Sequence, residues 1–338
     1  MTDRPALDAS ALTATLYAPH SFGGKFFNPW GDEPRGLRDL LRWKLGGGKT
    51  AFDKRAPLDI PVVANDGASL QGIADGGELT WVGHSTFAIH DRRDVVLTDP
   101  HWSARALLPQ RKRPPGIPLA SIPSHAFGVL SHSHYDHLDV RTARKLGPGF
   151  PWFVPLGLKD WMHKRGIPNV VEMDWWQTIE RGRWRITCLP AQHWSNRLSH
   201  ARNATLWCSW LLDSGERRYY FAGDSGYFHG FAEIGRRYAP IDVAMLPIGA
   251  YEPRWFMADQ HMNPAKAVQA HLDLQARQSV ATHFGCFQLT DEAIDAPLIA
   301  MHEALATRGI DSPSFRALRP GETWRIAARP PLAAIASA

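Results

Sequence analysis

The sequence predicts a layered fold of the α/β (α+β) class, and two observations point to it. From residue 78 onward, short runs rich in β-branched and aromatic residues alternate with turn residues, which is typical of strands. Segments with apolar residues at helical spacing lie between several of these runs. A chain that mixes strands and helices along its length favours a domain built of stacked sheet and helix layers.

The expected elements follow one another at short intervals. The expected strands cover residues 79–82, 86–90, 95–98, 126–131, 152–155, 170–173, 185–189, 205–212, 218–222, 243–247 and 279–282. The expected helices cover residues 138–146, 157–165, 228–238, 264–274 and 297–307. Residues 1–75 show no sustained period except in the segment 36–45, where leucines recur at helical spacing. We therefore expect an N-terminal arm (1–75) that wraps a core domain (76–326), and a C-terminal tail (327–338).

The composition is that of a globular protein without a polyanionic partner. Hydrophobic residues make up 44% of the 338 residues and charged residues 21%, which allows a sizeable core. The 38 Lys and Arg residues exceed the 33 Asp and Glu residues only slightly, and the excess is spread along the chain. Because binding to nucleic acid needs a concentrated basic surface, we expect no nucleic-acid partner.

Other sequence features bear on disulfide bonding, localisation and oligomeric state. The cysteines Cys188, Cys208 and Cys286 show no paired C-x-x-C spacing, so neither a disulfide framework nor a cysteine zinc ribbon is indicated. The N-terminus lacks the features of a signal peptide, and no apolar run approaches about 18 residues. We expect a cytoplasmic protein, with peripheral membrane contact as an open alternative. The oligomeric state is not specified, and a homodimer stays open.

One glycine-rich segment resembles a phosphate-binding loop but does not fit the pattern. Lys49-Thr50 follows three glycines, yet Trp43 stands where the pattern needs its first glycine. A nucleotide-binding loop is therefore not expected here.

The strongest chemical signal is a cluster of metal-type side chains directly after an expected strand. The sequence Val129-Leu-Ser-His132-Ser-His134-Tyr-Asp136-His137 places three imidazoles and a carboxylate within six positions. On an extended segment His132 and His134 point the same way and can bind one ion, while Asp136 and His137 can face a second. Imidazole and carboxylate ligands suit zinc, iron or manganese.

Three further candidate ligands each follow a β-like run. His193 follows the run that ends near residue 189, Asp224 follows the run that ends at residue 222, and His283 follows the run that ends at residue 282. A sheet can present such strand ends together. Any one of these side chains alone is as compatible with a structural role, but together with the first cluster they indicate a binuclear centre.

The order of these motifs resembles the metallo-β-lactamase fold superfamily, and within it the N-acyl phosphatidylethanolamine-hydrolysing phospholipase D family. The likeness covers about residues 20–325. The motifs that carry it are Phe26-Phe-Asn-Pro-Trp30, Trp81-Val-Gly-His84-Ser-Thr86, Thr98-Asp99-Pro100, Gln192-His193-Trp194, Gly223-Asp224-Ser-Gly-Tyr227, His261-Met-Asn-Pro264 and Thr282-His283-Phe-Gly285. The resemblance implies a four-layer αββα sandwich, with the metal site at one edge where strand ends and loops converge.

The resemblance also implies a division of the ligands between two divalent metal ions, most simply zinc. Its first set is His132, His134 and His193, and its second set is Asp136, His137 and His283, with Asp224 bridging. Such a centre can hold a bridging hydroxide that attacks a phosphodiester. The expected reaction is phospholipase D-type cleavage of N-acyl phosphatidylethanolamine to N-acylethanolamine and phosphatidic acid.

Further residues are candidates for roles around the metals. We take Asp136, His261 and His84 as the catalytic candidates, with His261 contacting the phosphate or protonating the leaving oxygen. A helix-entry role for His261 and a turn role for His84 stay open. Asp99 and Asp139 are expected to hold the metal loops or to orient a ligand histidine.

Three segments are candidates for lipid contact, each with a plain structural alternative. The basic amphipathic segment 37–44, with Trp43, could lie on an anionic membrane or simply pack against the core. The basic sequence Arg111-Lys-Arg113 could meet headgroups or form a solvated loop. The sequence Trp255-Phe-Met257 offers exposed apolar bulk near His261.

Other functions use the same ligands or fit the chain less well. A binuclear hydrolase of a lactone or of a phosphorylated small molecule remains the alternative, and only the substrate discriminates it. A nuclease would need a basic groove or an extra domain, and several β-lactam hydrolases of this fold carry a cysteine where Asp224 stands. A non-catalytic metal module is disfavoured because the set of seven ligands is complete.

Overall fold

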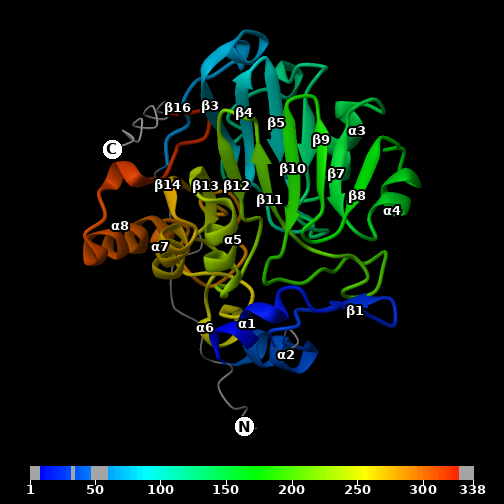
Figure 1. Ribbon diagram of the computed structural model, residues 1–338, viewed down its shortest axis with the longest axis vertical. Coiled ribbons are helices and arrows are strands. Elements are labelled where there is room, and N and C mark those ends of the chain that lie inside the picture. Colours follow the sequence, from blue (N-terminus) through cyan, green and yellow to red (C-terminus); the bar gives the residue numbers. More distant parts are fainter. Residues whose placement is uncertain (1–7, 32–34, 47–59, 327–338) are drawn as a thin grey trace, which may run out of the picture.

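Two seven-stranded sheets packed face to face form the centre of the computed structural model, which describes residues 8–31, 35–46 and 60–326 (Figure 1). The first sheet has the spatial order β16 (Thr323–Arg325), β3 (Ala74–Gly83), β4 (Thr86–Arg92), β5 (Asp94–Thr98), β6 (Phe127–Val129), β7 (Trp152–Pro155) and β8 (Val170–Met173). The second has the order β15 (Phe315–Arg316), β14 (Ala276–Thr282), β13 (Ile241–Pro247), β12 (Arg218–Phe221), β11 (Ser209–Asp213), β10 (Trp184–Leu189) and β9 (Thr178–Arg181).

Strand direction brings several loops to one edge of the sandwich. In the first sheet β3, β5 and β6 run the same way, because β4 is antiparallel to both β3 and β5, and β5 is parallel to β6. In the second sheet β10, β12 and β14 run the same way for the equivalent reason. The carboxyl ends of codirectional strands share an edge, which is where open sheets of this kind bind ligands.

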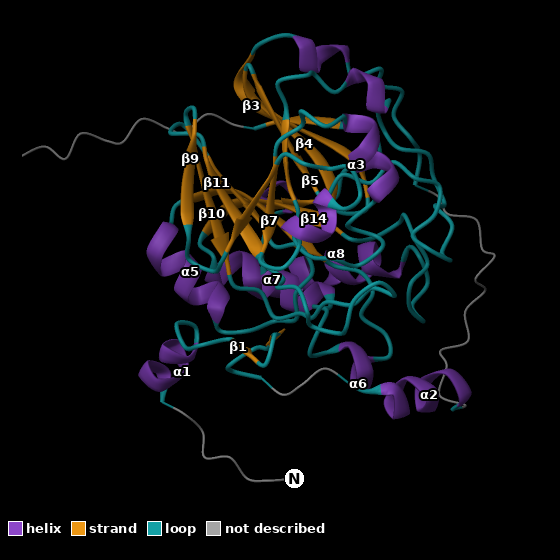
Figure 2. Cartoon of the chain, turned by 90° about the vertical axis from the view of Figure 1, so that its right-hand side faces the viewer, coloured by secondary structure: helices purple, strands orange, loops and turns teal. Residues whose placement is uncertain are grey.

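Helices cover the outer face of each sheet (Figures 1 and 2). The first sheet carries α3 (Val140–Leu146) and α4 (Lys159–His163), and the second carries α5 (Gly230–Tyr238), α7 (Pro264–Asp273) and α8 (Ala296–Arg308). The layers are therefore helix, sheet, sheet and helix. The expected α/β class and the four-layer αββα sandwich are confirmed.

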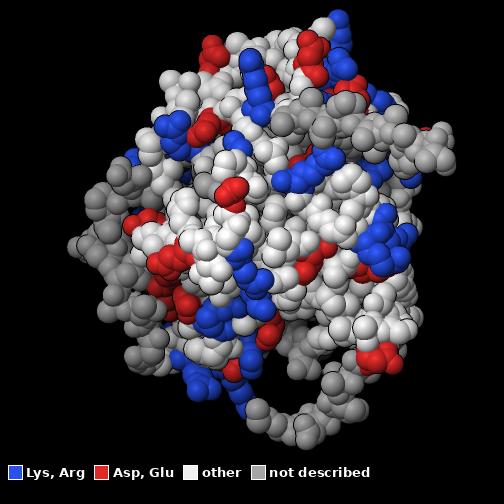
Figure 3. Space-filling model, turned by 60° about the vertical axis from the view of Figure 1, so that its left-hand side comes forward, with Lys and Arg blue, Asp and Glu red and all other residues white. Residues whose placement is uncertain are grey.

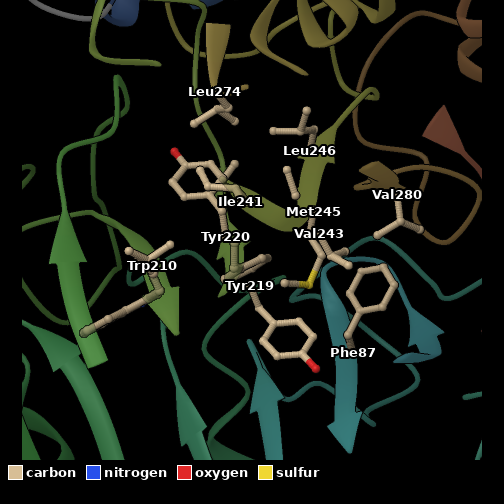
Figure 4. Packing of buried hydrophobic residues seen from close by; sticks show 14 of the residues in the cluster. Phe87, Trp210, Tyr219, Tyr220, Ile241, Val243, Met245, Leu246, Leu274 and Val280 are labelled. Carbon is tan, nitrogen blue, oxygen red and sulfur yellow. The ribbon is translucent and has the colours of Figure 1, made fainter. Parts of the chain in front are cut away.

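Alternation along the strands assigns each side chain to a layer. On β4, Phe87 and Ile89 belong to the core between the sheets, whereas Ala88 packs with the cluster under α3 and α4. Figure 4 shows Phe87 among residues of β12 and β13, including Tyr219 and Met245. Burial on both faces explains why these strands read as continuous apolar runs.

The N-terminal segments lie at one end of the molecule, near α6 (Arg254–Met257), in Figures 1 and 2. They comprise α1 (Ala9–Thr15), β1 (Ser21–Phe22), β2 (Lys25–Phe26) and α2 (Leu37–Leu45). The sequence shows no sustained period before the segment 36–45, and α1 is a short helix there, none of whose side chains is buried. Weak burial leaves no apolar stripe in the sequence by which to recognise it.

The expected division at residue 75 stays a prediction, and β3 begins at Ala74. The expected tail 327–338 and the sequence Lys49-Thr50 lie outside the described residues. The structure adds strands β1, β2, β9, β15 and β16 and the helices α1 and α6 to the expected elements, and it starts β11 four residues later than expected. Short 3₁₀ turns cover Ala68–Gln71, Leu119–Ser121 and Ser312–Ser314.

Charges of both signs are interspersed over the face shown in Figure 3. Neither sign covers that face as a continuous field. Among the described residues, no helix combines the length and the apolar character needed to cross a bilayer.

Candidate metal centre

All the candidate metal-type residues follow the carboxyl ends of codirectional strands. In the first sheet His84 follows β3, Asp99 follows β5, and the loop 130–139 that begins α3 follows β6. In the second sheet His193 follows β10, Asp224 follows β12 and His283 follows β14. The site thus lies where both sheets present their carboxyl ends.

Three imidazole nitrogens form one compact group. His132 Nε2 lies 2.8 Å from His134 Nδ1, and His193 Nε2 lies 3.2 Å from the same atom. The three ring atoms could therefore bind one ion together. His132 and His134 come from the extended segment after β6, where alternate side chains face the same way.

A carboxylate and three imidazoles form a second group. Asp136 Oδ2 lies 3.1 Å from His84 Nε2, 3.5 Å from His137 Nε2 and 3.4 Å from His283 Nε2. These four atoms are also close enough to one another to bind one ion. His84, expected either in catalysis or in a turn, lies within this second group.

Asp224 stands between the two groups. Its Oδ2 atom is 3.1 Å from Nε2 of both His137 and His283, 3.8 Å from His193 Nε2 and 3.9 Å from His132 Nε2. One carboxylate oxygen therefore faces nitrogens of both groups, which is the arrangement that a bridging ligand requires.

The donor set fits divalent metal binding. Several polar atoms of the site are buried, yet His137 Nε2, His283 Nε2 and Asp224 Oδ1 have no hydrogen-bond partner of good geometry. Buried polar atoms without partners are costly, and nitrogen and oxygen donors of this kind are ligands for zinc, iron or manganese. The structure thus supports a metal centre here, and the separate assignment of each ligand stays a prediction.

Asp99 holds the first-sheet ligands in place, as expected. Its Oδ2 accepts a hydrogen bond from His137 Nδ1 at 2.6 Å, which turns His137 Nε2 toward Asp224. Its carboxylate also accepts from the Ser131 backbone at 2.7 Å and from the Ser131 hydroxyl at 2.6 Å. The ligand loop and the end of β5 are therefore joined through one buried carboxylate.

Several of these positions have backbone conformations that are rare for side chains other than glycine. The φ angles of His84, Asp99 and His283 are 55°, 35° and 59°. Each costs about 1–3 kcal/mol and persists because the surrounding structure holds it. Gly223, before Asp224, has φ 58°, and a Cβ atom there would lie 2.4 Å from Ser131 Cβ. Only glycine therefore lets Asp224 approach the first sheet.

The buried carboxylates favour protonation of two of the neighbouring imidazoles. Burial disfavours charge on His283, but Asp224 and Asp136 outweigh it and raise the pKa of His283 to about 9. They raise the pKa of His137 as well. By contrast, burial and the neighbouring His193 lower the pKa of His134 to about 3, so that ring is neutral and ready to coordinate.

His261 precedes α7 and faces the site from the second sheet. Its Nδ1 lies 4.0 Å from Asp224 Oδ2 and has no hydrogen-bond partner, and its ring packs edge-on against His193. Asn263 caps α7 and Pro264 opens it, so His261 is also a helix-entry residue. Burial holds its pKa well below the usual range and keeps the ring neutral.

Three expectations about neighbouring residues are corrected by the structure. Asp139 does not orient a ligand histidine: it caps α3 and accepts from Ser103 N and Thr142 Oγ1, because it lies at the first turn of that helix. The loop 111–113 is solvated only in part: Lys112 is exposed, but Arg111 is buried and donates to the backbone carbonyl of His101 at 2.6 Å.

The third concerns the segment after Pro253. Only Trp255 is exposed, whereas Phe256 and Met257 are buried against Trp43 of α2. The helical turn of α6 directs these two side chains inward. Trp43 accordingly packs inside the protein and does not face outward on the amphipathic segment.

Residues that support the ligands through backbone carbonyls were not recognisable in the sequence. Gln260 accepts from His193 Nδ1 at 3.0 Å, which fixes the ring so that Nε2 faces the site. Arg197 Nη1 donates to the carbonyls of Ser133 at 2.6 Å and Leu138 at 3.0 Å, on either side of the ligands. Because the partner is the main chain, no pattern of side chains announces such contacts.

A cavity of about 630 Å³ opens beside the candidate metal centre. His134, Asp136, Asp224 and His261 line its polar end. The rest of its wall includes Leu40, Trp43, Leu108, Leu198, Phe256 and Met257, together with the arginines Arg35, Arg197 and Arg202. The cavity can therefore hold a ligand with one anionic end and a bulky apolar body.

Comparison with known proteins identifies the family of this chain. The family model described as Beta-lactamase superfamily domain matches residues 94–284. The chain is 36% identical over 332 residues to the N-acyl-phosphatidylethanolamine-hydrolyzing phospholipase D 1 of Caenorhabditis elegans, covering 90% of this chain and 92% of that protein. It is 38% identical over 271 residues to an uncharacterized protein of Mycobacterium tuberculosis, covering 77% and 71%.

Solved structures share the fold at low identity. Igni18, a metallo hydrolase from the archaeon Ignicoccus hospitalis, matches with a TM-score of 0.56 and 21% identity, covering 73% of this chain and 97% of that one. This similarity concerns the fold alone. The family model and the Caenorhabditis elegans relative show that the chain belongs to the metallo-β-lactamase superfamily and, within it, to the N-acyl-phosphatidylethanolamine-hydrolysing phospholipase D family.

Proposed function

We propose that the protein is a binuclear phosphodiesterase that cleaves N-acyl phosphatidylethanolamine to N-acylethanolamine and phosphatidic acid. One observation carries the proposal: the His and Asp side chains of the centre form one end of a large, mainly apolar cavity. A metal site for small polar esters has no need of such a wall. The name of the Caenorhabditis elegans relative supports the same substrate.

We propose the following ligands. His132, His134 and His193 would hold one ion, Asp136, His137 and His283 the other, and Asp224 would bridge them. Zinc is the proposed metal, since imidazole and carboxylate donors suit it, with iron or manganese as alternatives. When bound, two such ions activate a water molecule near neutral pH and neutralise charge on a phosphate oxygen.

His261 and His84 assist the hydrolysis of the substrate. Water adds to phosphorus, the P–O bond to the N-acylethanolamine breaks, and the leaving oxygen takes up a proton. Neutral His261, with its free Nδ1 near Asp224, can donate a hydrogen bond to the phosphate or the leaving oxygen. His84 interacts directly with Asp136 and can hold that carboxylate in its orientation.

The first experiment loads the protein with zinc, adds a defined N-acyl phosphatidylethanolamine, and identifies the products by mass spectrometry. We expect N-acylethanolamine together with phosphatidic acid, and neither from the variant Asp224→Asn. If the lipid survives while bis-p-nitrophenyl phosphate is cut, the metal site stands and the lipid substrate is wrong. Lactones and smaller phosphodiesters would then be tested, which is the alternative function.

We propose in addition that the rim of the cavity touches the membrane that holds the substrate. Leu107 and Leu108 form the tip of a turn between Arg105 and Gln110, and Leu108 is 79% exposed. Leu107 has φ 60°, an unfavourable conformation for leucine. Leu198, 89% exposed, lies on the same cavity wall. Exposed leucines beside Arg105 suit the interface of an anionic bilayer.

Sedimentation with vesicles that contain anionic phospholipid tests this contact. Replacing Leu107 and Leu108 by Ser should weaken binding about tenfold, because about 1.4 kcal/mol of apolar burial is lost. Ile299→Ser, at an exposed position of α8 that does not line the cavity, is the control and should bind as the unchanged protein does. Equal binding of all three proteins would contradict the proposed rim contact.

A further inference from the structure

The N-terminal arm makes polar contacts that a mere cover for the core would not need. Asn28 is buried and lies between His193 and Trp207. Its Nδ2 donates to the backbone carbonyl of His193 at 3.0 Å, and its Oδ1 accepts from Trp207 Nε1 at 3.0 Å. Trp207 Nε1 also donates to the Ala191 carbonyl at 3.0 Å. A single arm residue therefore ties down the backbone of a candidate ligand.

Neighbouring arm residues bind the same loop at other points. Trp30 Nε1 donates to Gln192 Oε1 at 3.1 Å, and Phe26 N donates to the Asn203 carbonyl at 2.8 Å. Asn203 in turn accepts from Ser195 N at 3.2 Å through its side chain. The arm segment 26–30 thus contacts the loop 191–203 both at His193 and at its far end.

Aromatic packing holds this segment against the residues before α5 and the connection between β8 and β9. The Trp30 ring stacks on Phe228 with centroids 5.0 Å apart and lies 5.4 Å from the ring of Trp175. This packing would persist without the Asn28 contacts. The apolar attachment of the arm and its polar hold on the ligand loop are therefore separable by substitution.

We propose that Asn28 is a positioning residue that keeps His193 in place for metal binding, so that the arm forms part of the metal centre. This inference rests on the proposed metal site. The Gln260 carbonyl fixes the rotation of the His193 ring, and Asn28 fixes the backbone from which the ring projects. His193 belongs to only one of the two groups, so loss of Asn28 should affect one ion more than the other.

The experiment measures zinc release from the full chain into a chromophoric chelator, with zinc per protein counted beforehand. The test variant is Asn28→Asp, which has the same shape and still accepts from Trp207 but cannot donate to the His193 carbonyl. We expect one ion to leave about tenfold faster and the other at the original rate. The matched control is Tyr17→Phe, which removes an arm contact to Glu233 far from the loop and should release zinc normally.

Unfolding temperatures measured without metal separate positioning from general destabilisation. If Asn28→Asp does not fold, Asn28→Ala serves instead, because it removes the bond to the His193 carbonyl without placing a charge beside it. Unchanged release from the folded variants, or equal acceleration of both ions, overturns the role of Asn28. Failure of the unchanged protein to hold zinc overturns the proposed metal site, a result distinct from either of these.

Discussion

At the scale of single residues, the two nitrogens of His137 and of His193 face different partners. His137 donates from Nδ1 to Asp99 and presents Nε2 to Asp224 and Asp136, and His193 donates from Nδ1 to Gln260. These outer hydrogen bonds select the tautomer and the direction of the coordinating atom. Substitutions can therefore separate residues that hold metal from residues that act on substrate.

Substitution of ligands and of His261 should give different results. Asp224→Asn and His134→Ala should lose metal and hydrolysis together, because each removes a donor from the centre. His261→Ala should retain metal and lose about 10²–10³-fold in kcat, the usual range for a group that assists proton transfer or binds the phosphate. Metal content and turnover are measured on the same samples. An unchanged rate in His261→Ala would remove it from the mechanism.

His101 should make the stability of the metal-free protein depend on pH. Burial, aided by Arg111, lowers the pKa of His101 to about 4, so the folded state holds it neutral. Below about pH 6.5 His101 becomes protonated in the unfolded chain but stays neutral in the folded chain. The stability present above pH 6.5 is therefore lost as pH falls toward 4, by about 3 kcal/mol from this residue.

The variant His101→Asn retains an acceptor for Arg111 but does not titrate. Urea unfolding between pH 4.5 and pH 7.5, after chelation of metal, should show a flatter profile for the variant than for the unchanged protein. Other buried histidines contribute equally to both proteins. Parallel profiles would mean that His101 is not held neutral by the fold.

At the scale of elements, the sequence predicts best those segments whose pattern arises from burial. β13 and β7 are buried throughout and appear as continuous apolar runs. β9 was missed, because Thr178–Arg181 is a half-exposed edge strand with polar residues. β3 is longer than expected, since Gly76 and Gly77 interrupt the pattern of β-formers at its start.

In the candidate site, too, some residues are recognisable from the sequence and others are not. Its seven proposed ligands are recognisable because imidazole and carboxylate side chains cluster at strand ends. The contacts of Asn28, Gln260 and Arg197 each involve a main-chain carbonyl. Every residue type has such a carbonyl, so no sequence pattern marks these contacts. Only the fold, by bringing distant loops together, reveals these contacts.

Helix α3 should depend on its cap. Asp139 accepts from Arg141 N at 3.1 Å and from Ser103 N at 3.0 Å, so Asp139→Ala should lower the free energy of unfolding by about 1–2 kcal/mol. Asp8→Ala removes the cap of α1, whose residues are not buried, and should hardly change global unfolding. Urea titrations measure both. Equal effects would show that α3 draws its stability from packing alone.

At the scale of the whole molecule, the candidate centre joins the two sheets. His84, His132, His134, Asp136 and His137 come from loops of the first sheet, whereas His193, Asp224 and His283 come from loops of the second. Separation of the sheets would take these groups apart. A metal bound by both sets therefore stabilises the sandwich as a unit.

Metal removal should accordingly destabilise the entire domain. At a free zinc concentration a thousandfold above the dissociation constant, binding adds about 4 kcal/mol to the free energy of unfolding. Chelation should move the urea midpoint to lower concentration in one cooperative transition. A transition that stays in place, in protein shown to hold zinc beforehand, would mean that the ions do not couple the two sheets.

The stacked rings around Trp30 have an optical consequence. Trp30 and Trp175 lie 5.4 Å apart, and His20 stacks on the other indole at 4.3 Å. Indoles at such separations exchange excitation and produce a near-ultraviolet circular dichroism signal that vanishes when they part. Undocking of residues 20–30 can therefore be observed without any attached label. The protein carries its own reporter for the state of its N-terminal arm.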